Sequence, residues 1–360
     1  MTRLFCTLLA TFALLAAGAV PAEPYLAVQL GYQCAACHVN PTGGGLRNDF
    51  GTVFTENAMA MKPLPEGVPV WSGRLGDFVR LGGDLRASWS RTDVPGSPAQ
   101  HATGVDQLRV YAAAEVIPER LGLYVDEALA PGDARVQEAY ARLSFPASGV
   151  YVKAGQFYLP FGWRLQDNTA FVREVSGIGM TTPDGGVELG LVRGPWSAQL
   201  DVTNGVANAG TGAGQQLTAQ AVRTLPGWRV GLAVTHTDSP AGNRDAAGLF
   251  AGIRTGRVAW LGEADLVRDA GFPEGGRRLL ALLGEADWRV VQGQNLKLTY
   301  EYDDPDRSIA EDQQTRWSLL YEVTPLPFVQ VRAGFRRYRG IPQSDLENRR
   351  FAFLELHGFF

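Results

Sequence analysis

Polar and apolar residues alternate in short segments from about Asp77 to the end of the chain. In Leu296–Tyr302 one face carries Leu, Leu, Tyr and Tyr, and the other carries Lys, Thr and Glu. The segments Trp317–Val323 and Val329–Phe335 repeat this pattern. A period of two is typical of β-strands with one apolar face. The pattern predicts sixteen strands separated by turn residues and loops.

The predicted strands are Phe78–Ser90, Gln107–Ile117, Leu121–Ala128, Arg135–Phe145, Val150–Tyr158, Val187–Val192, Trp196–Thr203, Gln216–Arg223, Trp228–Thr237, Ala246–Arg254, Val258–Val267, Leu279–Val290, Leu296–Tyr302, Arg316–Val323, Val329–Arg337 and Arg350–Phe359.

A closed ring of sixteen strands is too wide for side chains to fill its interior. The apolar faces should therefore point outward to lipid and the charged faces into a lumen. Connections after even-numbered strands are tight, whereas most connections after odd-numbered strands are longer and polar, such as 93–104 and 303–313. Short periplasmic turns and long outer loops are typical of outer-membrane barrels. The fold class predicted is an all-β, transmembrane antiparallel β-barrel with both termini in the periplasm.

Two details refine this barrel. The longest gap, Pro160–Gly186, is the third outer loop, which in porins folds into the lumen and narrows it. The last strand ends on Phe360, as outer-membrane barrels commonly do. Its alternation places Leu354 and Leu356 outside, and Glu355 and His357 inside near the periplasmic mouth.

Composition and charge bound the function. The chain has 360 residues, 43 glycines and a net charge of −4, so no nucleic-acid-binding surface is indicated. No apolar run after residue 22 approaches the roughly 20 residues of a membrane helix. Arg3, the apolar run after it and the small residues before a cut at Ala22 predict a cleaved signal peptide over residues 1–22. Cys6 leaves with that peptide.

The motif that carries chemistry is Cys34-Ala-Ala-Cys37-His38. Two thiols with two residues between them can add to the two vinyl groups of one haem, and the adjacent histidine then ligates the iron. The alternatives are a structural zinc site, a thioredoxin-like redox pair and a local disulfide. Zinc needs four ligands and the redox pair needs a βαβ setting, neither of which the sequence supplies. We therefore predict one covalent haem c held by Cys34, Cys37 and His38.

The segment after His38, Asn40–Gly45, contains Pro41 and three glycines, so a long helix cannot follow the ligand. It predicts a loop that closely approaches the haem edge. Met59 and Met61, further along the same segment, are candidates for the sixth iron ligand. His357 is a weaker candidate, and an open or water-bound site remains an alternative.

Residues 24–57 resemble the haem segment of the fused monohaem cytochrome–porins of the outer membrane, known from iron-oxidising bacteria. The resemblance lies in Tyr25–Asn48, which includes Cys34, Cys37 and His38. It implies that residues 23–75 form a monohaem cytochrome c segment that plugs the barrel, residues 76–360, from the periplasmic side. The triple glycine at 43–45 is not a hallmark of the iron-oxidising members.

The function expected from these features is an electron conduit across the bacterial outer membrane. It would connect an extracellular redox substrate, such as a metal ion, with a periplasmic c-type cytochrome. Lumen carboxylates such as Glu285, Asp287, Glu301 and Glu322 would tune the iron potential or lead cations inward. The alternatives are a diffusion porin with a haem-bearing plug or redox sensor, and a porin-like protein without haem. No hydrolytic or transferase site is indicated.

Overall fold

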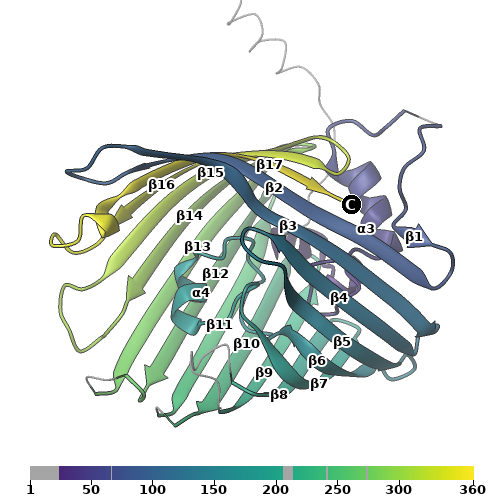
Figure 1. Cartoon of the computed structure of the whole chain (residues 1–360), viewed down its shortest axis with the longest axis horizontal. Helices are drawn as coiled ribbons and strands as arrows, with labels where there is room; N and C mark the ends of the chain where they lie inside the picture. The colour runs from purple at the N-terminus through teal and green to yellow at the C-terminus, as the bar shows by residue number, and fades with distance from the viewer. Residues whose placement is uncertain (1–23, 66, 206–213, 241, 273–274) are drawn as a thin grey trace, which may run out of the picture.

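The computed structural model describes residues 24–65, 67–205, 214–240, 242–272 and 275–360. The predicted signal peptide lies outside this range. Figure 1 shows a closed barrel of tilted strands with an N-terminal arm, residues 24–73, at one end. Among the described residues, no helix has the length and apolar character needed to cross a bilayer.

Sixteen antiparallel strands of the described residues form the wall, which closes because the first of them, β2, pairs with the last, β17. A short additional strand, β1 (Arg74–Leu75), pairs only with β2. The wall strands are β2 (Val79–Asp93), β3 (Gln100–Ile117), β4 (Leu121–Ala130), β5 (Arg135–Phe145), β6 (Val150–Tyr158), β7 (Pro183–Arg193), β8 (Trp196–Thr203), β9 (Gln215–Leu225), β10 (Trp228–Asp238), β11 (Arg244–Thr255), β12 (Val258–Asp269), β13 (Arg277–Val291), β14 (Gln294–Asp304), β15 (Gln314–Leu326), β16 (Val329–Arg339) and β17 (Arg350–Phe359).

The barrel, its sixteen strands and their inward and outward faces are confirmed. Leu298 and Trp317 are about half exposed on the outer surface, at 46% and 50%, whereas the neighbouring Thr299 and Glu301 are buried inside. Leu354 and Leu356 likewise face out, and Glu355 and His357 face in. An apolar outer wall around a polar interior is the arrangement that a lipid environment favours.

One predicted loop is shorter than expected. We expected residues 93–104 to form a long connection, but β3 begins at Gln100 and its pairing with β2 continues to Thr92. Trp89 and His101 lie against each other across this extension, with ring centroids 5.8 Å apart. Cross-strand ring contacts of this kind stabilise a hairpin whose sequence lacks a clear apolar alternation.

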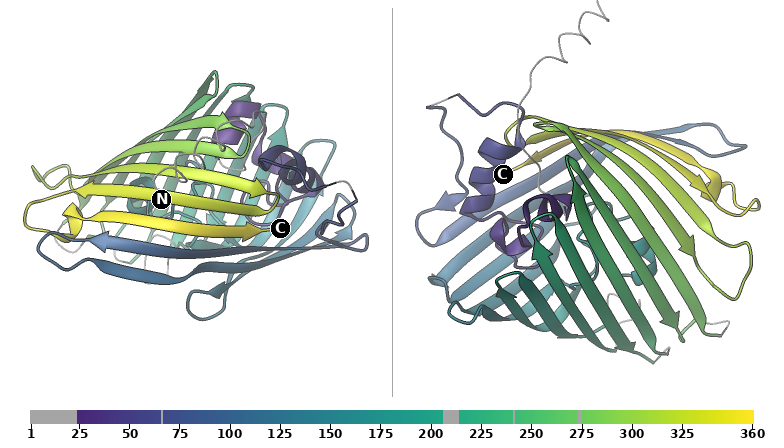
Figure 2. Two further views of the ribbon diagram at one scale, coloured as in Figure 1. Left: turned by 90° about the horizontal axis from the view of Figure 1, so that it is seen from above. Right: turned by 180° about the vertical axis from the view of Figure 1, so that it is seen from behind.

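The arm contains two short helices, α2 (Pro24–Leu30) and α3 (Asp49–Phe54), with a 3-10 turn at Cys34–Ala36 and a π-helical turn at Thr55–Met59. Figure 2 shows the arm reaching into one mouth of the barrel. This is the mouth of the tight turns, because Gln33 donates to Gly194 O and Gly227 N donates to Val28 O.

The connection between β6 and β7 folds into the lumen, as the sequence predicted. It carries the short helix α4 (Phe171–Ser176), which packs inside the barrel against β12, β13 and β14 (Figure 1). Residues 159–182 of this connection are called the inner loop below. Arg173 of the inner loop forms a buried ion pair with Glu263 of β12, with an Nη2–Oε2 distance of 2.7 Å. Nearby, the amide of Trp163 donates to the same carboxylate.

Candidate functional site: a cavity behind the Cys-x-x-Cys-His turn

The Cys34–His38 segment forms a tight turn in the arm, and Cys34, Cys37 and His38 all line one cavity. The amides of Cys37 and His38 both donate to Cys34 O, at 3.1 and 3.0 Å. Asn48 fixes the turn from outside, because its side-chain amide donates to Ala35 O and Ala36 O. The same Asn48 caps α3 by accepting from Gly51 N. The turn is therefore rigid before any group is bound to it.

The glycine run after His38 forms a loop, as predicted, and its glycines pack closely against neighbouring residues. Gly43, Gly44 and Gly45 all have positive φ angles, which side chains other than glycine rarely adopt. A Cβ atom on Gly45 would lie 2.1 Å from the hydroxyl of Tyr124, and one on Gly43 would lie 3.0 Å from Cβ of Cys34. These three glycines therefore fit between Tyr124 of the barrel wall on one side and Cys34 on the other.

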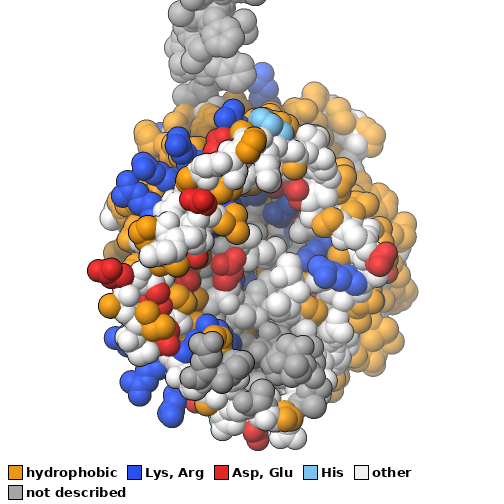
Figure 3. Space-filling view, turned by 60° about the vertical axis from the view of Figure 1, so that its left-hand side comes forward, with side chains coloured by type: hydrophobic (Ala, Val, Ile, Leu, Met, Phe, Trp, Pro, Cys, Tyr) orange, Lys and Arg blue, Asp and Glu red, His pale blue; other side chains and the backbone are white. Residues whose placement is uncertain are grey.

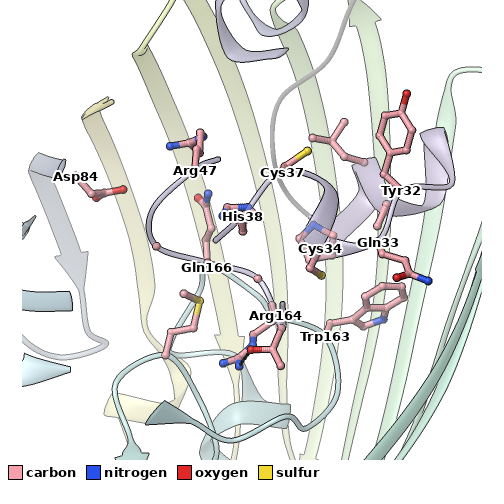
Figure 4. A pocket seen from close by; sticks show the side chains of 18 of the residues that line it. Tyr32, Gln33, Cys34, Cys37, His38, Arg47, Asp84, Trp163, Arg164 and Gln166 are labelled. Atoms are coloured by element: carbon pink, nitrogen blue, oxygen red, sulfur yellow. Dashed lines mark hydrogen bonds between the residues drawn. The ribbon is translucent and has the colours of Figure 1, made fainter. Parts of the chain in front are cut away.

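Cys34, Cys37 and His38 line one cavity inside the barrel (Figure 4). Its empty space is about 1320 Å³, part of which is open to solvent. The arm supplies one side of the lining and the inner loop supplies another, through Trp163, Arg164, Gln166 and Met180. The barrel wall closes the rest from β2, β3, β9, β10 and β17. A large ligand attached to both thiols would lie within the lumen.

The protonation state of His38 suits binding of a metal through an imidazole nitrogen. Burial, followed by the charge of Arg47, lowers the pKa of His38 to about 4, so the imidazole is neutral at pH 7. A neutral imidazole has a free lone pair for a metal. Burial raises the pKa of the Cys37 thiol to about 11, which keeps this thiol protonated until it reacts.

The cavity lining is strongly positive. It contains five arginines, Arg47, Arg86, Arg109, Arg164 and Arg229, against one carboxylate, Asp84, which leaves an excess of four positive charges.

Asp84 is already counted in this difference, and its carboxylate is bound by Arg86, Gln107 and His357, at 3.2, 2.7 and 2.8 Å. Arg109 pairs with Asp126, with an Nη1–Oδ2 distance of 3.2 Å. Arg229 contacts Cys34 Sγ at 3.8 Å, and its Nε and Nη1 are buried without a hydrogen-bond partner among the described residues.

The two methionines proposed as sixth ligands lie away from this cavity. Met59 is buried in the arm and accepts a hydrogen bond from Thr55 at 3.3 Å. Met61 lies against the β13–β14 turn, where its amide donates to Thr324 O. Ligation by either stays a prediction that the arrangement does not favour. Met180, which sequence analysis did not consider as a sixth ligand, does line the cavity with His38.

His357 is placed at the cavity, but both ring nitrogens have partners. Nε2 contacts Asp84 at 2.8 Å and Nδ1 contacts Gln330 at 3.2 Å. It is thus held as a polar residue of the lumen wall. The four carboxylates expected to act on the iron, Glu285, Asp287, Glu301 and Glu322, lie on β13, β14 and β15, outside the cavity lining.

Comparison of the whole structure with known structures finds the same barrel. The chain is similar to the anion-selective porin from Comamonas acidovorans, with a TM-score of 0.63 and 13% identity over 78% of this chain and 99% of the porin. The fold is that of the bacterial porins. The channel DcaP of Acinetobacter baumannii gives a TM-score of 0.59 at 12% identity, covering 78% of this chain and 97% of the channel. OmpT of Vibrio cholerae with loop L8 deleted gives a TM-score of 0.60 at 11% identity, covering 79% of this chain and 100% of OmpT. No protein-family model and no curated protein matches the sequence.

Proposed function

We propose that the chain is a bacterial outer-membrane barrel that holds one covalent haem c in its lumen and passes electrons between the two sides of the membrane. The observation that supports this most is the placement of Cys34, Cys37 and His38 together on one cavity inside a porin-like barrel. Bound there, a haem would supply one-electron redox chemistry.

The residues of the chain then have defined tasks. Cys34 and Cys37 would hold the group through thioethers, and His38 would supply an axial nitrogen. Arg47 and Arg109 have buried Nε–H groups without an acceptor among the described residues, and such groups suit the carboxylates of a haem. The arm closes the tight-turn mouth, which we take to be periplasmic, where a c-type cytochrome would exchange electrons. The barrel would replace lipid with protein around this path.

Covalent haem is tested directly on the full chain produced with the c-type haem maturation machinery. We expect a haem-stained band and a pyridine haemochrome spectrum for the wild type. Cys34→Ala, Cys37→Ala and His38→Ala should reduce bound haem at least tenfold, whereas Ala36→Ser, inside the same motif, should retain it. In sealed liposomes, an impermeant oxidant outside should then oxidise haem reduced from within. Folded barrel without covalent haem would refute the proposal.

A second candidate function is a diffusion channel in which the arm acts as a plug. It is favoured by the likeness to porins and by a second space of about 560 Å³ between the inner loop and β13–β17. Asp167 of the inner loop binds Arg316 and Arg336 across this space, at 2.8 and 3.0 Å. This candidate predicts that removal of residues 24–62 raises solute flux into liposomes manyfold, with folding checked by heat-modifiable gel mobility.

A further inference from the structure

We propose that the redox reactant that reaches this cavity is an anion, and that Arg229 is the group that receives it. The inference rests on the proposed function, because it names the substrate class of that same site. It departs from the expectation that a metal cation is the extracellular substrate.

The first argument is the state of Arg229. Arg229 is 7% exposed, and no hydrogen bond from it to a described carboxylate is formed. Two of its three nitrogens have no acceptor among the described residues, and the third has only the Cys34 sulfur at 3.8 Å. A buried guanidinium without an anion costs several kcal/mol, so its neighbourhood is built for a negative partner. Stacking on Trp163, whose ring centroid is 5.6 Å from Cζ, offsets only part of that cost.

The second argument is position. Arg229 projects from β10, whereas Arg109 projects from β3, seven strands away in a ring of sixteen. Cys34 Sγ lies beside Arg229, so a haem thioether would lie at this wall. The carboxylates of a haem leave the ring at the edge opposite its thioethers, and they would therefore not satisfy Arg229. With a haem held in this way, the partner of Arg229 would come from outside the cofactor.

The third argument is the total charge. The lining has an excess of four positive charges, which falls to three when Asp126, the partner of Arg109, is counted. A ferric haem carries one net negative charge and a ferrous haem two, so the loaded cavity stays positive in both states. An incoming cation is repelled and an anion is attracted. The lumen is also hollowed at the mouth shown in Figure 3, where side chains of both signs line the opening.

The test uses two one-electron oxidants of opposite charge on the reduced, haem-loaded full chain. The protein gives one electron from its iron to ferricyanide, which becomes ferrocyanide, or to tris(phenanthroline)cobalt(III), which becomes cobalt(II); no proton moves and no bond to the protein forms. For the wild type, added salt should slow the reaction with ferricyanide and accelerate that with the cobalt complex.

Arg229→Gln should slow the reaction with ferricyanide about fourfold. This is the effect expected when one unit charge about 7 Å from a triply charged ion is removed in water at about 0.1 M salt. The same variant should accelerate the cobalt complex. A change in the haem reduction potential would shift the rates with ferricyanide and with the cobalt complex in the same direction. Opposite shifts therefore show that the charge of Arg229 is responsible. Arg229→Lys should restore the wild-type rates.

Arg223→Gln is the matched control, because Arg223 lies on neighbouring β9 but is exposed on the outer wall. Haem content and heat-modifiable mobility are measured for every variant. Salt effects of the same sign for both oxidants, or equal shifts in Arg229→Gln and Arg223→Gln, would overturn the inference while leaving the haem conduit intact. Absence of haem from the wild type would instead overturn the proposed function.

Discussion

The ion pair between Arg173 and Glu263 should control whether the inner loop stays folded into the lumen. Both side chains are almost fully buried, at 5% and 0% exposure, and Arg173 Nη2 contacts both carboxylate oxygens, at 2.8 and 2.7 Å. Removing one partner leaves the other charged and buried, which costs about 3–5 kcal/mol. Arg173→Gln and Glu263→Gln should each destabilise the folded barrel by about that amount.

The double variant carries no unpaired charge. It should therefore be no less stable than either single variant, and the two changes should be strongly non-additive. The assay is urea unfolding of the protein in lipid vesicles, followed by tryptophan fluorescence and gel mobility, with channel conductance as a measure of the loop position.

The control is the exposed pair Arg91–Asp93, whose side chains are 47% and 38% exposed. Asp93→Asn should change the free energy of unfolding by no more than about 1 kcal/mol. Single variants at the buried pair that cost under about 1 kcal/mol, or a double variant whose cost equals the sum of the two, would show that the pair does not anchor the loop.

Three further changes test the site and its support. Met180→Leu should lower the haem reduction potential measured by redox titration, whereas Met59→Leu should not, because only Met180 lines the cavity; equal potentials in both variants would exclude Met180 as a ligand. Gly162→Ala should destabilise the barrel by about 1–3 kcal/mol in urea titrations, since Gly162 has φ of 63° and its Cβ would lie 1.7 Å from a Glu263 oxygen; an unchanged midpoint would contradict that packing. Hydrogen bonding from Arg74 holds the pKa of Asp49 below its usual range, so Asp49 contributes stability that is complete above pH about 4 and is lost as the pH falls through the lowered pKa. At pH 7 the wild type should exceed Asp49→Asn by less than about 1 kcal/mol in unfolding free energy, and a gap that persists unchanged at pH 1 would refute the assignment.

The existence of the strands could be predicted because alternating apolar and polar residues are a local feature of the sequence. Arg135–Phe145 and Trp196–Thr203 have the predicted bounds, since one apolar face and a tight turn at one end determine each of them. The candidate haem motif could be found in the sequence because it consists of five consecutive residues, and haem attachment there stays a prediction.

The cavity wall was not predictable. Arg229 and Met180 meet Cys34 and His38 from segments about 140 to 195 positions away, and inward-facing residues of a barrel look alike in sequence. Met59 was favoured only because it follows the haem motif closely, yet the arm turns it toward Thr55. Separation along the sequence therefore says little about which side chains lie close together in a closed barrel.

The closure of β17 onto β2 also imposes an order of assembly. Cys34 and Cys37 lie on a cavity enclosed by the ring, and the arm is fastened to its turns through Gly194 and Gly227. An enzyme that joins a prosthetic group to these thiols is itself a folded protein, too bulky to enter the finished lumen. If the chain carries the proposed haem, attachment of the haem would therefore have to precede closure of the barrel, and a chain whose wall closes first would stay without it.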